Sequence, residues 1–163
     1  MNGFVIPLTA ATLVGSGMMA GLYTVFSVMV MRGLRRLPGR SGITAMQAIN
    51  EAVPSPLFGL MFVDLALGSV ALIVVAARQG GAPSTVYLLV GSGLFLASTA
   101  ITLAYHVPRN NALATVDPAA PGADGVWATF LREWVPANHL RAALALGAAV
   151  AFSVALSRLA EAG

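Results

Sequence analysis

The sequence predicts an all-α fold, namely a four-helix transmembrane bundle with two short amphipathic interfacial helices in its cytoplasmic loops. Hydrophobic residues make up 58% of the chain and charged residues only 9%, whereas about 25% charged residues are usual in a soluble domain. A hydrocarbon core of about 30 Å requires about 20 apolar residues in a helix. Four apolar stretches approach or exceed that length, at about residues 4–31, 56–77, 84–105 and 139–156. We therefore expect one four-span membrane domain over residues 1–163.

The first span is the clearest of the four, because no charged residue occurs from Met1 to Met31. This run is too long for the apolar region of a signal peptide, and no basic segment precedes it, so no cleavable signal is expected. Inside it, Gly17 and Gly21 form a pair of small residues four positions apart, which lets two membrane helices approach closely. The pair indicates either packing within the bundle or a homo-oligomer seam.

The second span contains one carboxylate, Asp64, roughly 12 Å from its start at helical rise. Because a charge is costly in hydrocarbon, we expect Asp64 to face the bundle interior or a wet cavity. Two interpretations stay open, a proton relay or a protonated acid that is hydrogen-bonded to the third span. The hydroxyl groups of that span are Ser98, Thr99 and Thr102. Gly80, Gly81 and Pro83 predict the tight turn between the two spans.

The distribution of arginine predicts the orientation of the bundle. Most of the nine basic residues lie in or beside the loops at residues 32–56 and 106–138. These are Arg32, Arg35, Arg36, Arg40, Arg109, Arg132 and Arg141. Only Arg78 and Arg158 lie on the other side, so both termini should face outward and both large loops the cytoplasm, in the plasma (inner) membrane. Nucleic-acid binding is not expected, because no basic patch is interleaved with aromatic residues, and the absence of cysteine excludes thiol chemistry.

An amphipathic helix is predicted in the first large loop, from Ser41 as N-cap to about Val53, where Pro54 and Pro56 end it. One face is apolar and the other carries amides and a carboxylate, at helical spacing. The apolar residues are Ile43, Met46, Ile49 and Val53, and the polar ones are Gln47, Asn50 and Glu51. Such a helix lies at the membrane surface or folds back over the mouth of the bundle.

A second amphipathic helix is predicted in the other large loop, from Asp124 as cap to Trp134. Its apolar face consists of Trp127, Phe130, Leu131 and Trp134. Aromatic side chains of this kind favour the level of the lipid headgroups. The stripe is more typical of a membrane anchor or a core face than of a ligand platform.

Polar side chains gather where the third span ends and the fourth begins. His106, Asn110 and Asn111 lie around Pro108, and Asn138, as the N-cap of the fourth span, precedes His139 and Arg141. Both histidines and Glu51 are predicted on the same membrane side. Three ionisable groups at one mouth indicate a site for proton transfer or for a metal.

Metal binding is the weaker interpretation of this cluster. His106, His139 and Glu51 would form a two-histidine, one-carboxylate set, but no HxxxH or ExxH spacing occurs. No cofactor is therefore predicted, and a metal stays an alternative.

Several stretches in order along the chain carry a resemblance to a known family. They are Ala20–Met31 with Phe26 and Ser27, Met46–Asn50, Val107–Leu113, the tryptophans Trp127 and Trp134, and Asn138–Arg141. In these features the chain resembles the anthrone oxygenase-like family of small integral membrane proteins (domain of unknown function 1772). It departs from the usual family pattern at His106, Arg109 and Asn111, where asparagine, leucine and aspartate are common.

The resemblance implies a four-helix membrane protein, some of whose relatives oxidise anthrones to anthraquinones with molecular oxygen and without an organic cofactor. By position it also implies a set of site residues. These are Gln47, Asn50, Asn110, Asn138, His139 and Arg141, with Trp127 and Trp134 in support.

These residue types suit the removal of a proton from an anthrone, whose carbanion is an enolate. Histidine titrates near neutral pH and is a suitable base, while amides and an arginine stabilise an enolate oxygen in a dry pocket. We expect His139 to act as base, Arg141 and Asn110 as oxyanion partners, and His106 as a second acid–base group. The remaining residues would bind a lipophilic aromatic or quinol-like substrate within the membrane lipid. They are Gln47, Asn50, Glu51, Asn138, Trp127 and Trp134.

Two alternatives remain on the sequence alone. The first is a non-enzymatic lipophile-binding protein or structural membrane subunit, in which the polar residues at the mouth of the bundle are only structural. The second is a metal-dependent membrane oxidoreductase that uses His106, His139 and Glu51.

Overall fold

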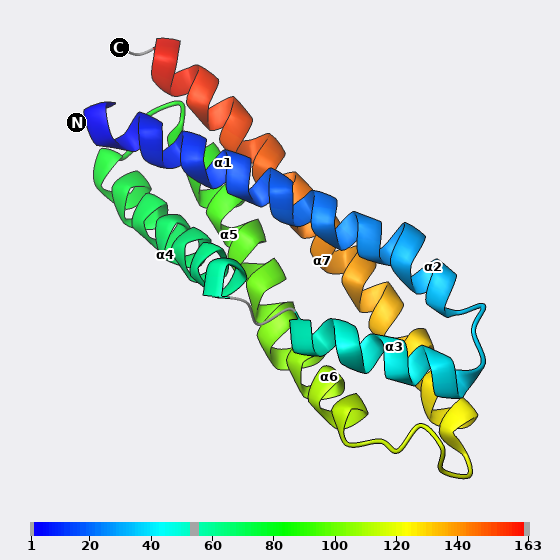
Figure 1. Cartoon of the computed structure of the whole chain (residues 1–163). Helices are drawn as coiled ribbons and strands as arrows, with labels where there is room; N and C mark the ends of the chain where they lie inside the picture. The colour runs from blue at the N-terminus through cyan, green and yellow to red at the C-terminus, as the bar shows by residue number, and fades with distance from the viewer. Residues whose placement is uncertain (1, 53–55, 162–163) are drawn as a thin grey trace.

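A computed structural model describes residues 2–52 and 56–161, and within these ranges the chain is helical without strands (Figure 1). The elements in chain order are α1 (Asn2–Val25), the π turn η1 (Phe26–Val30), α2 (Met31–Leu34), α3 (Gly39–Ala52), α4 (Pro56–Gln79), α5 (Thr85–Ile101), the π turn η2 (Thr102–His106), α6 (Val107–Ala114) and α7 (Ala123–Glu161). The all-α prediction is confirmed.

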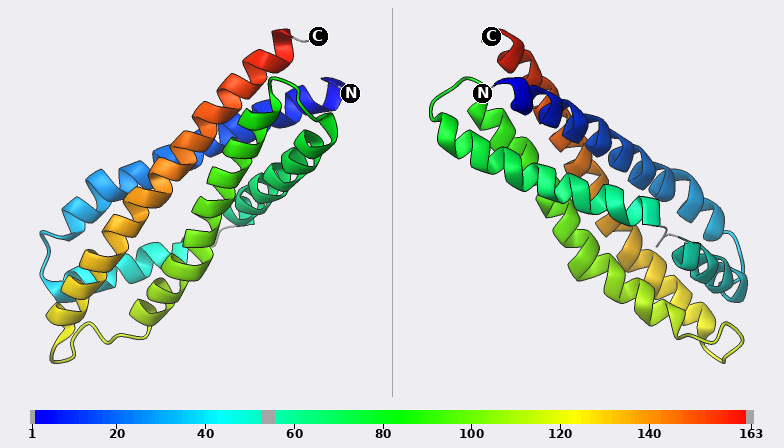
Figure 2. Two further views of the ribbon diagram at one scale, coloured as in Figure 1. Left: turned by 180° about the vertical axis from the view of Figure 1, so that it is seen from behind. Right: turned by 60° about the vertical axis from the view of Figure 1, so that its left-hand side comes forward.

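Four helical stretches are long and apolar enough to cross a membrane, as predicted. They are Gly3–Leu34, Phe58–Arg78, Thr85–Ala114 and Ala123–Glu161. Both ends of the chain lie at the same end of the bundle, as an even number of crossings requires (Figures 1 and 2). At the opposite end α3 packs across α6 and the first half of α7 (Figure 1).

The third and fourth spans extend further than the sequence indicates. The third was predicted to end at about Tyr105, but the helix continues through η2 into α6. Pro108 comes just after the π turn η2, and local π adjustments of this kind let a membrane helix accommodate a proline. The fourth span and the predicted helix at 124–134 form a single helix, α7, with Pro136 inside it. The helix at 124–134 is therefore not a separate interfacial element.

Burial of an aromatic stripe accounts for the continuity of α7. Trp127, Phe130, Leu131 and Trp134 are all buried and form a core cluster with Ile43 and Met46 of α3. The stripe is thus a core face, one of the interpretations that the sequence favoured over a ligand platform. Its burial offsets the hydrogen bond that Pro136 removes from the helix.

The start of α3 depends on a residue from α7. The helix begins at Gly39, two residues before the expected N-cap Ser41. The Gly39 N–H donates to Oδ1 of Asp124 over 2.9 Å, so Asp124, in the first turn of α7, supplies the N-terminal acceptor of another helix. Gly42 lies against the indole of Trp127, where a side chain would collide. The expected end of this helix at Pro54 lies outside the described residues.

Asp64 does not face the bundle interior, so that expectation is wrong. Its neighbour Leu65 is buried in the core, whereas Asp64 itself is exposed on the outer face of α4. The hydroxyl groups assigned to it have other acceptors. Ser98 donates to the Arg141 carbonyl, Thr99 to that of Phe95 and Thr102 to that of Ser98.

The glycine pair of the first span also faces outward. A Cβ at Gly17 or Gly21 would meet no atom within 4 Å. Intramolecular packing is therefore the wrong interpretation of this pair, and the homo-oligomer seam stays a prediction. The closely packed glycine of α1 is instead Gly15, which faces the side chain of Leu65 on α4.

Gly91 of α5 tests the packing of the bundle directly. A Cβ there would lie 2.8 Å from the ring of Phe152, which is fully buried on α7. We expect Gly91→Ala to lower the free energy of unfolding by about 1–3 kcal/mol, the usual cost of overpacking. Gly93→Ala, in the same helix but with open space at its Cβ, should leave stability equal or slightly higher. Denaturation of both variants in detergent compares them, and equal losses would contradict this packing.

Candidate active site in a cavity beneath α3

A cavity of about 280 Å³ lies between α1, α3, α4, α5–α6 and α7. Most of its wall is apolar, from Leu22, Phe26, Met46, Ile49, Phe58, Phe62, Leu103, Val107 and Trp134. Its polar groups are Tyr23, Asn50, Thr102, His106, Asn110 and Arg141. An apolar wall with a few converging polar groups is typical of small-molecule sites.

Arg141 is the charge at the polar side of this cavity. It projects from the middle of α7 and is only 8% exposed. Its Nε donates to Asn138 Oδ1 over 2.6 Å and its Nη1 to Thr102 Oγ1 over 3.2 Å. The guanidinium carbon lies 4.0 Å from the centre of the Tyr23 ring. No carboxylate pairs with Arg141 in the described part of the chain, so a buried cation faces the cavity with only neutral partners.

Asn138 holds Arg141 in place. Its Nδ2 donates to the Tyr23 carbonyl over 2.7 Å and to Ser27 Oγ over 2.6 Å, while its Oδ1 accepts from Arg141. The expected role as an N-cap is wrong, because Asn138 lies within α7 and is fully buried. This one amide therefore links the arginine to the first π turn, and Thr102 links it to the second. Such π turns are frequent at functional sites.

His106 ends the second π turn and is 1% exposed. Its Nδ1 lies 3.3 Å from the Ile101 carbonyl, and its ring packs edge-on against Trp134 with 4.9 Å between centroids. Nε2 is buried without a hydrogen-bond partner among the described residues, and the main chain of Trp134 lies near the imidazole ring. If Nδ1 carries the hydrogen and donates to Ile101, Nε2 has the free lone pair of a base.

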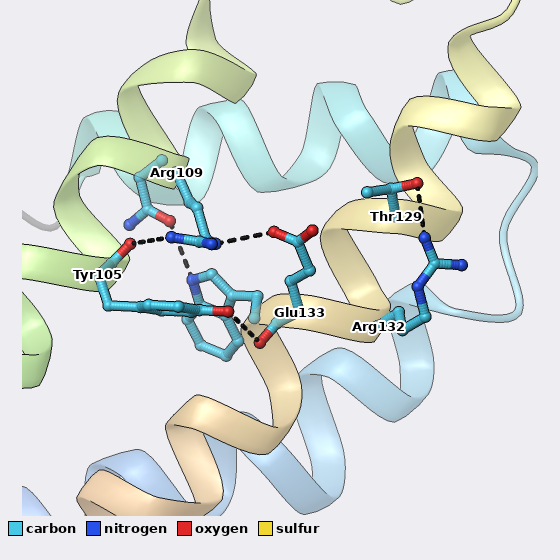
Figure 3. A network of polar contacts seen from close by, with 7 residues as sticks. Tyr105, Arg109, Thr129, Arg132 and Glu133 are labelled. Atoms are coloured by element: carbon cyan, nitrogen blue, oxygen red, sulfur yellow. Dashed lines mark hydrogen bonds and ion pairs between the residues drawn. The ribbon is translucent and has the colours of Figure 1, made fainter.

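A polar network beside the cavity fastens the η2–α6 segment to α7 (Figure 3). Arg109 forms an ion pair of 2.9 Å with Glu133 and stacks on the Tyr105 ring at 3.4 Å. Tyr105 in turn donates its hydroxyl to the Glu133 carbonyl. Since this pair is partly exposed, it contributes about 0–1 kcal/mol. Its role is to keep the helix that carries His106 against α7.

Asn110 continues this contact toward the cavity. Its Oδ1 accepts a hydrogen bond of 2.9 Å from the indole N–H of Trp134. Since both residues line the cavity, the bond orients the amide and the indole together.

On α3, Asn50 and Gln47 have different surroundings. Asn50 lines the cavity, and its Nδ2 is buried without a hydrogen-bond partner among the described residues. Gln47 instead donates to the carbonyls of Leu113 and Val116 and ties α3 to the end of α6. Glu51 is exposed and outside the cavity. Asn50 is thus the donor that α3 offers to a ligand.

His139 lies apart from this group. It is exposed and lines a separate hollow with Arg32 and Arg35. The described residues contain no group of three histidine, aspartate or glutamate side chains that could hold a metal, so His106, His139 and Glu51 do not converge. Trp127 is also outside the cavity, buried against Phe130 with 5.7 Å between ring centroids.

Two polar residues of the cavity, Tyr23 and Thr102, were not among the predicted site residues. Tyr23 is the only tyrosine of the first apolar span, and a lone polar aromatic group in such a span was a usable signal. Thr102 was considered only as a partner for Asp64. Neither position could be linked to Arg141 without the structure, because the three residues come from different helices.

Asn138→Ala tests the support of the arginine. The change leaves the Arg141 Nε without its acceptor and the Tyr23 carbonyl without its donor in a buried place. We expect a loss of about 3 kcal/mol in the free energy of unfolding. Asn111→Ala removes the same group from an exposed position and should cost less than about 0.5 kcal/mol. Equal effects in detergent denaturation would show that the Asn138 network does not stabilise the bundle.

Fold and site together define an α-helical membrane protein with a largely apolar internal cavity and a buried cation at its polar side. A family model described as anthrone oxygenase matches residues 56–151, more than half of the chain. The chain therefore belongs to the anthrone oxygenase family, and the resemblance noted in its sequence is confirmed. The matched range includes His106, Asn110, Asn138 and Arg141. Comparisons with curated proteins and with solved structures gave no match.

Proposed function

We propose that the protein is a membrane oxygenase that converts a lipophilic anthrone-like substrate to the corresponding quinone with molecular oxygen. The observation that supports it most is Arg141, a buried cation without a carboxylate partner in the described chain, beside a mostly apolar cavity. A buried charge of this kind is costly and is compensated when an anion forms next to it. The family description agrees with such a reaction.

The volume and lining of the cavity favour a compact polycyclic aromatic molecule. Its volume of about 280 Å³ is near the lower end of the range for ligand sites, about 300–1,000 Å³. Leu22, Gly59 and Leu103 line it and are also exposed on the outside of the bundle. A substrate dissolved in the bilayer would therefore reach the cavity from the side, between helices.

In the proposed reaction, His106 takes one proton from the CH₂ group of the anthrone at Nε2. The negative charge moves to the carbonyl oxygen, where Arg141 stabilises it together with the neutral donor Asn50. The enolate passes an electron to oxygen, and a C–O bond forms at the former CH₂ carbon. The O–O bond then breaks: one oxygen atom stays as the new carbonyl, and the other leaves as water with the two hydrogens of the CH₂ group. The balance is anthrone plus O₂ to anthraquinone plus water, with no other reductant.

This assignment moves the base from His139 to His106, because only His106 lines the cavity. Asn110 and Trp134 shape the wall beside it, and Asn138 positions Arg141. Gln47, Glu51 and Trp127 have no contact with the substrate in this proposal.

Oxygen uptake with anthrone as substrate tests the proposal. The detergent-purified protein should consume one O₂ per anthraquinone formed, well above the autoxidation measured without protein. Gly59→Trp, which places an indole where a glycine lines the cavity, should raise the KM or abolish uptake, while Gly93→Trp on the outer face of α5 should not. If wild-type protein binds anthrone without accelerating its oxidation, the lipophile-binding alternative is correct.

The orientation of the bundle is part of the same proposal. The arginines Arg32, Arg35, Arg36 and Arg40 lie in and after α2, at the end of the bundle that holds α3. By the positive-inside bias this end would face the cytoplasm of the inner membrane, with both termini outside. A reporter that is active only in the cytoplasm should therefore be silent when fused to the C-terminus.

A further inference from the structure

A second hollow of about 290 Å³ lies between the α1–α2 segment and α7 and shares no lining residue with the substrate cavity. Its polar groups are Ser27, Arg32, Arg35 and His139. All four side chains can donate hydrogen bonds, and no carboxylate is among the lining residues. The hollow is therefore suited to an anion.

Arg32 and Arg35 have no other polar partner in the described part of the chain. Both are exposed, and neither guanidinium takes part in a hydrogen bond or an ion pair there. By contrast, Arg109 pairs with Glu133 and Arg158 with Glu161. Two unpaired cations at one hollow raise its positive potential, which attracts an anionic ligand.

The depth of the hollow identifies the source of the anion. The first span, Gly3–Leu34, is 32 residues long and thus about 48 Å at helical rise, while the hydrocarbon core is about 30 Å thick. Arg32, in the last turn of this span, and Arg35, directly after it, would therefore be at the level of the lipid headgroups. In the two turns before Arg32, Val25, Val28 and Met29 are exposed and apolar, as a surface along acyl chains would be.

We propose that this hollow binds the phosphate of an anionic phospholipid, with Arg32 and Arg35 as its ligands. The acyl chains lie along Val25, Val28 and Met29. Basic pockets between membrane helices on the cytoplasmic side are known to hold lipid headgroups of this kind. The bound lipid would cover the hollow between the α1–α2 segment and α7.

Native mass spectrometry with defined lipids tests the site. Protein in neutral detergent is titrated with phosphatidylglycerol, with phosphatidylcholine or with inorganic phosphate, in ammonium acetate of roughly 0.5 M, where a Debye length of about 4 Å screens unspecific attraction. One phosphatidylglycerol per chain should bind at least about tenfold more tightly than phosphatidylcholine, as expected for charge-assisted hydrogen bonds. The double variant Arg32→Gln/Arg35→Gln should lose this preference.

The double variant Arg36→Gln/Arg40→Gln is the matched control, because it removes two exposed arginines that do not line the hollow. It should keep the preference for phosphatidylglycerol. Equal losses in both variants, or no preference in the wild type, would overturn the proposal, and displacement of the lipid by an equal concentration of inorganic phosphate would overturn it in favour of a solution anion. If the Arg32/Arg35 double variant melts earlier than the control without lipid, Arg35→Gln alone should weaken the preference. Since none of these readouts is turnover, they are independent of the proposed oxygenase activity.

Discussion

His106→Gln is expected to reduce the turnover of anthrone by about 10²–10⁴-fold, the usual contribution of a general base. Glutamine keeps a similar length and a donor for the Ile101 carbonyl, but it cannot accept a proton at the position of Nε2. Because the ring also packs on Trp134, thermal unfolding of the variant in detergent must be compared with that of the wild type. The measurement is the rate of anthraquinone formation at saturating substrate.

The second histidine supplies the control for this prediction. His139→Gln changes the same side chain in an exposed position outside the cavity. Its turnover should stay within about threefold of the wild type, because it loses no group that takes a proton from the substrate. If His139→Gln abolishes turnover and His106→Gln does not, the base assignment is wrong and the original expectation for His139 is right.

Arg141→Gln should reduce turnover by about 10²–10³-fold, as the loss of one oxyanion donor does in other enzymes. The effect should fall on kcat more than on KM, since the enolate charge exists only after the substrate has bound. Arg141→Lys keeps the charge but loses the bond from Nε to Asn138, so an intermediate rate is expected. The ratio of the kcat values of the two variants separates the effect of the positive charge from the effect of the hydrogen-bond geometry.

Arg132→Gln is the matched control for Arg141, because Arg132 is exposed and donates only to Thr129 in the described structure (Figure 3). Its turnover should equal that of the wild type. A similar loss in both arginine variants would point to a general effect of charge and would contradict a specific role for Arg141.

The spans could be predicted because their evidence is local. A run such as Met1–Met31 without a charge permits a membrane helix whatever its neighbours are. The limits of α7 could not be predicted in the same way. Pro136 and the polar residues after it resemble a helix start, and only the packing of Trp127 and Trp134 under α3 makes the chain continue through them.

The residue types of the candidate site and their positions in the chain could be predicted, but the directions in which the side chains point could not. His106, Asn50, Asn110, Trp134 and Arg141 were all expected at one mouth, and the structure brings these five around one cavity. His139 and Arg141 are two positions apart on α7, a rotation of about 200° around the helix, so Arg141 faces the cavity while His139 faces outward.

Asp64 on the second span shows that side-chain direction could not be predicted there either. Its position along α4 agrees with the prediction, but its neighbour Leu65 occupies the buried face. When a helix is apolar on all sides, its sequence does not show which side faces the core. The sequence alone therefore could not show which way Asp64 points.

The most direct test of the central claim is a structure of the protein with anthraquinone bound. We expect the rings between Phe62 and Trp134 in the cavity, with one carbonyl oxygen within about 3 Å of the Arg141 guanidinium. Anthraquinone in the hollow beside Arg32, or a cavity filled by a lipid chain while the quinone binds elsewhere, would contradict the assignment of this cavity as the place of reaction.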